Sequence, residues 1–140
     1  MTRQEIEAAI ASGTKPNLNG QHLEGLDLSG LDLSRIDFGY ANLEGTKLAG
    51  ANLENAIFWS ATARHADFGR ARLRGANLGT GDFSGSNFHD ADLGSADLLG
   101  ATLDGADLRG ADLRGANLQN AIIGNAAHDA TTRWPDGFAP

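Results

Sequence analysis

The sequence of 140 residues contains no cysteine, one methionine and three prolines. Without cysteine the chain forms no disulfide bond and offers no thiolate to a metal, which is typical of proteins from reducing compartments. No apolar run reaches the roughly 18 residues that a membrane-spanning helix needs. No apolar segment follows the first residues as it does in a secretory signal. We therefore expect a single-domain cytoplasmic protein without a membrane span.

Motifs of catalytic and metal sites are missing as well. The four histidines are scattered along the chain, and none has the spacing of metal ligands. Serine–glycine pairs such as Ser29-Gly30 lie outside any G-x-S-x-G motif and lack a partnered base. The sequence therefore predicts no enzyme activity, no metal and no cofactor.

Positive charge is scarce. Eleven Lys and Arg residues stand against 18 Asp and Glu residues, so the formal net charge is −7. Affinity for nucleic acid or anionic lipid depends on clustered Lys and Arg, so we expect no direct nucleic-acid or membrane binding. The same charge favours electrostatically steered encounter with a basic protein partner.

A five-residue repeat dominates what is present. It runs without a slip over residues 16–125, which is 22 pentads, and residues 106–110 (Ala-Asp-Leu-Arg-Gly) show it clearly. The third position is Leu in 15 pentads and Phe in five, and the first is Ala in 14. Neither a helix nor a straight strand collects residues five apart on one face. Only a chain that turns within every pentad does so, and this periodicity is the signature of a solenoid.

This run resembles the pentapeptide-repeat proteins, whose motif is A(D/N)LXX, and the resemblance covers about four-fifths of the chain. The resemblance implies an all-β solenoid, namely a right-handed quadrilateral β-helix. Each pentad then forms one side, four pentads form one coil, and the first and third positions point inside. The 110 residues of the repeat make about five and a half such coils. Aspartate and asparagine at second positions are short acceptors that are suited to bond the turn backbone.

The residues before and after the repeat are expected to close its ends. Residues 1–15 are predicted to form a short α-helical cap, because Thr2 and Glu5 match a capping box and Ile6 and Ile10 share one face. An uncovered end of a β-helix is an edge that invites pairing, so this apolar face is expected to cover the first coil.

Residues 126–140 are predicted to form a capping tail. Trp134 and Phe138 flank a proline and a glycine there, which favours a lid folded over the last coil. The alternative is a hook that contacts a partner or a second copy, so the sequence leaves monomer and homodimer both open.

Residues 20 apart stack into columns in such a coil, so the outer positions can be sorted by side. We call the pentads that begin at 16, 36, 56, 76, 96 and 116 the first side, and those that begin at 21, 41, 61, 81 and 101 the second side. The first side displays large apolar groups and two charges, whereas the second carries four carboxylates against one arginine. Clustered outward apolar groups indicate a contact surface. The predicted partner surface comprises Tyr40, Ile57, Trp59, Leu99, Glu24, Glu44, Asp82 and Asp104.

Three packing expectations follow from the columns. Trp59 stands between Gly39 and Gly79, so its indole is expected to lie flat across both neighbouring coils, unless it merely packs against its own side. Phe83 is expected to fill the space left by Ala63, with Gly81 making room for the ring. On the side that begins at residue 31, the columns predict two cross-strand ion pairs. These are Arg72 with Asp92 and Glu54 with Arg74.

The function that these observations favour is a rigid bacterial scaffold acting as a protein–protein interaction or structural module, with an unknown protein partner. The resemblance implies an alternative, because some members of the family inhibit or protect DNA gyrase by imitating the shape and charge of DNA, the quinolone-resistance proteins among them. The net negative charge and the width of the rod fit that alternative. The short rod and the uneven distribution of charge weigh against it.

Overall fold

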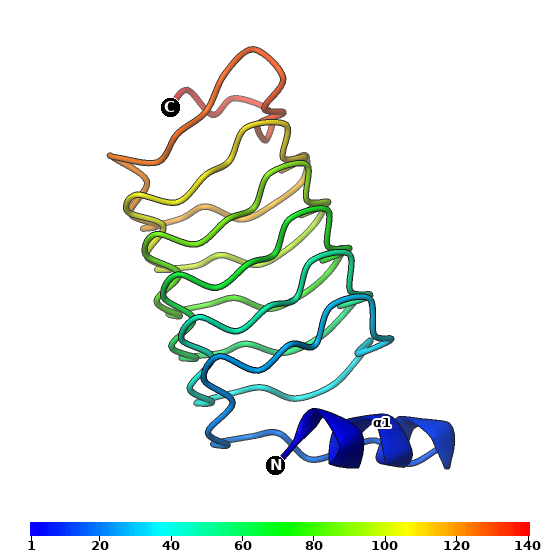
Figure 1. The fold of residues 1–140 in the computed structure, drawn as a ribbon. Coiled ribbons are helices and arrows are strands. Elements are labelled where there is room, and N and C mark those ends of the chain that lie inside the picture. Colours follow the sequence, from blue (N-terminus) through cyan, green and yellow to red (C-terminus); the bar gives the residue numbers. More distant parts are fainter.

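The computed structural model describes residues 1–140 as one short helix followed by a stack of flat coils (Figure 1). The helix α1 (Arg3–Ala11) lies beneath the first coil, and the C-terminus lies at the other end of the rod. Parallel bridges join each second-position residue to the one 20 residues later, from His22 with Asn42 onward. Each side contributes one bridge residue instead of a long strand. The predicted coil of four pentads is confirmed.

A turn closes every side of the coil. The amide of Ala41 donates to the carbonyl of Phe38 at 3.0 Å, and this bond between the first position of one pentad and the third of the pentad before recurs along the rod. The fifth position between them has positive φ, as in Gly45 (66°) and Tyr40 (59°). A positive φ at the second central residue is what a type II turn requires, and it explains the glycines at this position.

Aspartate and asparagine at second positions hold these turns, as expected. The Oδ1 atom of Asp37 accepts a hydrogen bond from the amide of Gly39 at 2.7 Å, and Asp97 accepts from the amide of Leu99 at 3.0 Å. The repeated acidic residues therefore have a structural role in the turn.

Third-position side chains fill the interior. Phe83 contacts Phe58 and Phe68 edge-on, at centroid distances of 6.4 and 5.9 Å, and these two rings flank Ala63 in the coil before. A Cβ atom added to Gly81 would lie 2.5 Å from Cε2 of Phe83, so the glycine does make room for the ring. The expected compensation between Ala63 and Phe83 is confirmed. The five fully buried phenylalanines form one cluster, made of Phe38, Phe58, Phe68, Phe83 and Phe88.

The first coil is joined to α1 by packing and by hydrogen bonds. Thr2 and Glu5 form the predicted capping box, and Ile6 is fully buried against the core. The Nη1 atom of Arg3 donates to the carbonyl of Asp27 at 2.6 Å. The helix is nine residues long, and the chain has no helix with both the length and the apolarity needed to cross a membrane.

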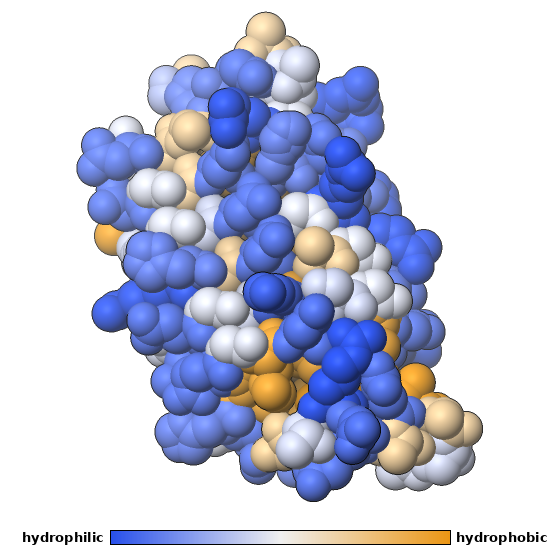
Figure 2. Space-filling model, in the orientation of Figure 1, coloured by the Kyte–Doolittle hydropathy of each residue, from blue (hydrophilic) through white to orange (hydrophobic).

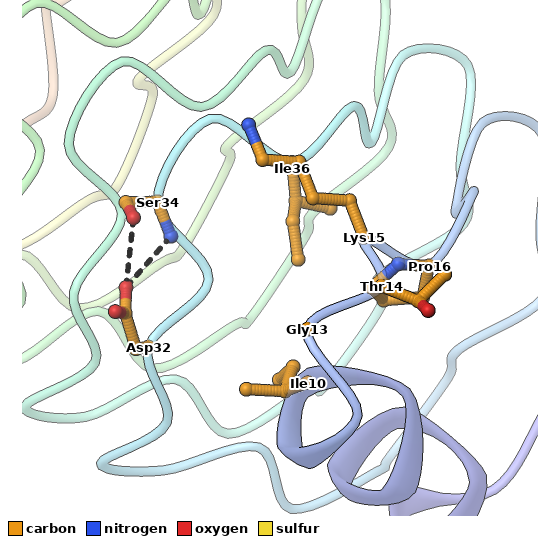
Figure 3. Close-up of a pocket in the computed structure, with 8 residues that line it drawn as sticks. All are labelled: Ile10, Gly13, Thr14, Lys15, Pro16, Asp32, Ser34 and Ile36. Atoms are coloured by element: carbon orange, nitrogen blue, oxygen red, sulfur yellow. Dashed lines mark hydrogen bonds between the residues drawn. The ribbon is translucent and has the colours of Figure 1, made fainter.

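A small hollow of about 150 Å³ remains between α1 and the rod. Ile10 and Ile36 point into it from the helix and from the coil, and Lys15 and Pro16 lie at its rim (Figure 3). Figure 2 shows apolar surface gathered near this end of the molecule.

The backbone ladder continues beyond the expected end of the repeat at residue 125. Asp107 pairs with Ala127, and Asp112 pairs with Arg133 in a register of 21 instead of 20, which absorbs one inserted residue. The hydroxyl of Thr132 donates to the carbonyl of Leu108 at 2.9 Å and is buried. Pairing persists here because it uses backbone groups and does not need the Ala and Leu pattern.

Aromatic rings follow at the C-terminal end. Trp134 is partly buried against the core and lies 5.4 Å from the ring of His128 and 5.2 Å from that of Phe138, measured between centroids.

Candidate interaction surface

The structure places the four apolar residues of the predicted surface on the first side of the rod. Tyr40 is 65% exposed and Ile57 is 39% exposed, whereas Trp59 and Leu99 are partly exposed. Exposed apolar groups that lie together, and not single ones, mark contact surfaces. The predicted residues therefore lie together on one side and in reach of solvent.

The indole of Trp59 lies against Gly79, the residue below it in the same column. A Cβ atom added to Gly79 would overlap Cζ3 and Cε3 of the ring. The nearest Trp59 atom to the same position on Gly39 is the backbone carbonyl oxygen, at 3.6 Å. The expectation that the indole crosses both neighbouring coils is therefore wrong, since the ring covers only the following coil.

Other outer side chains lean in the same direction. In each case the residue 20 positions later is a glycine, and a Cβ atom added to it would overlap the leaning side chain. The pairs are Asn55 with Gly75, His65 with Gly85, Arg74 with Gly94, and Asp90 with Gly110. A large outer residue followed by glycine 20 residues later is thus a sequence signal for a side chain that lies over that glycine, with Asp104 as an exception, since it bonds Asn125 and leaves Gly124 uncovered. Sequence reasoning applied it only to Trp59.

The acidic residues of the second side are not equivalent. The Nε atom of Arg64 donates to Oδ2 of Asp82 at 2.6 Å. Burial acts to raise the pKa of Asp82, but hydrogen bonds from Ser84 and Arg64 outweigh it, so the pKa lies below its ordinary value. Asp82 is therefore neutralised by Arg64, and the structure removes it from the free acidic charge of the surface.

The remaining carboxylates have no arginine or lysine within ion-pair distance. Glu24 accepts a hydrogen bond from Nδ2 of Asn42 at 2.7 Å, and Asp104 accepts one from Nδ2 of Asn125 at 2.8 Å. The pKa of Glu24 is lowered, first by its own backbone amide and then by the ring of His22. Glu44 is exposed. These three carboxylates carry the uncompensated negative charge of the second side.

The corner between the two sides carries no charge. It is formed by fifth-position residues of the first side, among them Tyr40, Ser60 and Thr80, and the hydroxyl oxygens of Ser60 and Thr80 lie 2.7 Å apart. The apolar first side and the acidic second side are therefore joined through neutral polar groups. Sequence reasoning did not identify this hydroxyl pair, although its spacing of 20 residues is the signal that predicts it.

The two ion pairs predicted for the side that begins at residue 31 do not form. Arg72 and Asp92 are bridge partners, but the ion pair to Asp92 comes from Nη1 of Arg74 at 3.6 Å. Arg74 leans over Gly94 and thereby reaches the carboxylate diagonally, away from Glu54. The lean of the side chain, and not the strand register, decides the partner.

Other carboxylates pair with an arginine of their own pentad. Asp107 binds Arg109 and Asp112 binds Arg114, each with Nη2 at 2.7 Å from Oδ2. The hydrogen bond from Arg109 is the main reason that the pKa of Asp107 falls to about 2. The described chain holds no group of three or more metal-ligating side chains.

Comparisons with known proteins agree with this geometry. The family model for pentapeptide repeats matches residues 41–85 and 82–120 with eight copies. A stack of 20-residue coils that is built from such repeats is a β-solenoid. The chain belongs to the pentapeptide-repeat family, which is generally a non-enzymatic scaffold fold. A search of curated proteins found no match.

Solved structures of pentapeptide-repeat proteins are similar to the chain. Rfr23 from the cyanobacterium Cyanothece 51142 is 26% identical, with a TM-score of 0.51, over 82% of this chain and 88% of that one. HetL from Nostoc sp. strain PCC 7120, a protein involved in heterocyst differentiation regulation, is 28% identical, with a TM-score of 0.34, over 92% and 78%. A trypsin-treated form of QnrB1, a plasmid-mediated fluoroquinolone resistance protein, is 18% identical, with a TM-score of 0.45, over 83% and 86%.

Proposed function

We propose that this pentapeptide-repeat protein is a rigid, non-enzymatic interaction module that binds a protein partner through its first and second sides. The observation that carries the proposal is the indole of Trp59, laid on Gly79 beside the exposed groups of Tyr40 and Ile57. Aromatic residues with one face in water are enriched at protein interfaces. The cytoplasmic location stays a prediction.

Rigidity is part of the proposal. The chain makes 88 hydrogen bonds between backbone groups, and nearly all of them lie in turns or between coils. A surface that is held by such a ladder is ordered before binding and loses little conformational freedom in the complex.

We also infer the finer architecture. The coils are right-handed and quadrilateral, since parallel connections are overwhelmingly right-handed and four turns close each coil. The chain divides into an N-terminal helical cap (1–15), the repeat (16–125) and a C-terminal capping tail (126–140). The burial of Ile6 and the packing of Trp134 at the two ends support the caps.

Affinity capture with purified variants tests the contact surface. The double variant Tyr40→Ala with Trp59→Ala is expected to lose a partner that the unmodified protein captures from a lysate of its own organism. The matched control changes two exposed residues of the third side, Lys47→Ala with His89→Ala, and is expected to keep the partner. Circular dichroism confirms that both variants are folded. A partner that remains bound to the Tyr40 and Trp59 variant contradicts the proposed surface.

The alternative function is a DNA mimic that acts on DNA gyrase. The net charge of −7 supports it. A duplex presents a continuous row of phosphates, whereas the acidic residues here are interrupted by pairs such as Arg64 with Asp82 and Arg109 with Asp107. The likeness to QnrB1 concerns the fold alone.

A gyrase supercoiling assay, titrated with the protein in the presence and absence of a fluoroquinolone, separates the two functions. The interaction module predicts no effect up to high micromolar concentration. Inhibition or protection at low micromolar concentration selects the DNA mimic.

A further inference from the structure

The candidate surface combines an apolar strip with an acidic pair, and this combination specifies the chemistry of its occupant. We infer that the surface binds an extended basic segment of a partner protein, which places an apolar side chain beside Trp59 and lysine or arginine side chains at Glu24 and Glu44. The inference rests on the proposed function and adds the class of partner.

The apolar strip runs along one column of the first side. The ring of Trp59 covers Gly79, and Leu99 follows Gly79 in the same column. Adjacent coils lie about 4.8 Å apart, so the strip is about 10 Å long between Trp59 and Leu99. The nearby carboxylates of Asp37 and Asp97 accept hydrogen bonds from turn amides. The strip therefore offers a flat apolar contact to a side chain of the partner. The carboxylates beside the strip already accept hydrogen bonds within the rod.

The acidic pair lies across the corner, on the second side. Glu24 and Glu44 occupy the same column one coil apart, and both are exposed. Arg64, the next residue in that column, reaches onward to Asp82 and not back to Glu44. Two like charges about one coil spacing apart repel each other, and a cation placed between them relieves that repulsion. The pair is therefore suited to a lysine or arginine side chain.

The two features are within reach of one segment. Tyr40 lies at the corner in the same coil as Glu44, and its exposed ring adds a cation–π contact for a basic side chain. The corner also carries the neutral hydroxyls of Ser60 and Thr80. An extended chain of about eight residues covers roughly 26 Å, which exceeds the width of one side and two coils.

A second copy of this chain does not supply the basic segment, because neither of its terminal segments is basic: residues 1–15 carry two cations against two carboxylates, and residues 126–140 carry Arg133 against Asp129 and Asp136. Its third side carries four carboxylates against three cations, and its fourth side carries four of each. Nucleic acid is excluded by its own negative charge. Charge complementarity thus selects a different protein with a basic, partly apolar segment.

Three synthetic peptides of one length test the inference. The first is Lys-Lys-Leu-Ser-Leu-Lys-Lys-Ser, the second has Glu in place of Lys, and the third has Ser in place of Leu. Binding is followed by the fluorescence of Trp59 in a Trp134→Phe background, and by isothermal titration calorimetry on the unmodified protein should that variant not fold.

In 50 mM salt the first peptide is expected to bind at least tenfold more tightly than either of the others. Its own affinity is expected to be at least threefold lower in 500 mM salt than in 50 mM salt. The double variant Glu24→Gln with Glu44→Gln is expected to lose about tenfold in affinity for it. The matched control, Glu54→Gln with Asp90→Asn, removes the same charge elsewhere and is expected to bind normally.

Equal binding of the lysine and glutamate peptides, equal effects of the two double variants, or no binding of any peptide overturns the inference. The proposed function is judged separately by the capture experiment. A partner that is lost from the Tyr40→Ala and Trp59→Ala variant, together with no preference for the lysine peptide, rejects the basic partner and leaves the interaction surface standing.

Discussion

Several large outer side chains lie over a glycine that follows them one coil later. Trp59, His65 and Arg74 all lie toward a glycine 20 residues on. The glycine leaves a place where a ring or a guanidinium group packs flat against backbone. This arrangement depends on the absence of a side chain at the glycine. A substitution of the glycine should therefore displace the larger side chain, although that residue itself is not mutated.

Substitution of Gly79 by alanine is expected to displace the indole of Trp59. The φ angle of Gly79 is not in the left-handed region, so the added Cβ atom acts through its overlap with the ring and not through backbone strain. We expect a folded protein, a shift of Trp59 fluorescence to longer wavelength, and a loss of about 1 kcal/mol in the free energy of unfolding. Gly124→Ala is the matched control, because no atom lies within 4 Å of its added Cβ. Identical spectra for the two variants contradict the packing described.

The pair of Asp107 and Arg109 makes a prediction for pH. The pKa of Asp107 is lowered from 3.8 to about 2, mainly by the hydrogen bond from Arg109. Since the folded pKa lies below the unfolded one, the stability from this pair is present above about pH 4 and is lost as the pH falls through about 2. In an NMR titration, Arg109→Gln is expected to raise the pKa of Asp107 toward its ordinary value, whereas Arg114→Gln leaves it low. An unchanged pKa in the Arg109 variant rejects the assigned cause.

Burial of individual residues could be predicted from the sequence, but ion-pair partners could not. First and third positions point inside because every turn repeats the same backbone geometry, and the pattern of Leu and Ala shows where they are. The partner of Asp92 depends on how Arg74 leans over Gly94, which strand register does not determine. The register of 20 residues fixes the sides on which the eight residues of the candidate surface lie, and their role in binding a partner stays a prediction. The structure adds which of the four carboxylates Arg64 pairs with, namely Asp82.

The two ends of the rod differ in structure. At the N-terminal end α1 (Arg3–Ala11) packs a fully buried Ile6 against the first coil. At the C-terminal end the ladder itself continues to Arg133, and Trp134 packs on the core. The helix was predictable from its capping box. The continued ladder was not, because backbone pairing leaves no side-chain pattern and one inserted residue shifts the register.

The buried face of α1 is expected to contribute to the stability of the whole rod. Ile6→Ala removes a fully buried side chain, so we expect a loss of about 2–4 kcal/mol in the free energy of unfolding, measured by urea denaturation. Gln4→Ala changes an exposed residue of the same helix and is expected to be nearly neutral. If the two variants unfold at the same urea concentration, α1 does not cap the rod.

The molecule as a whole is divided into unlike halves. The first and second sides hold most of the net negative charge and the exposed aromatic groups, whereas the other two sides are nearly balanced by their arginines and Lys47. The fold keeps these halves apart because each pentad is confined to one side. A partner that recognises both charge and apolar area therefore contacts a different surface on each half of the rod.

Site-specific photo-crosslinking examines this division most directly. A benzophenone amino acid is placed at Leu99 on the first side in one variant and at Lys47 on the third side in the other, and each protein is irradiated in a lysate of its own organism. The proposed interaction surface predicts one dominant protein adduct from position 99 and none from position 47. Adducts that form from position 47 alone, or equally from both positions, would contradict it.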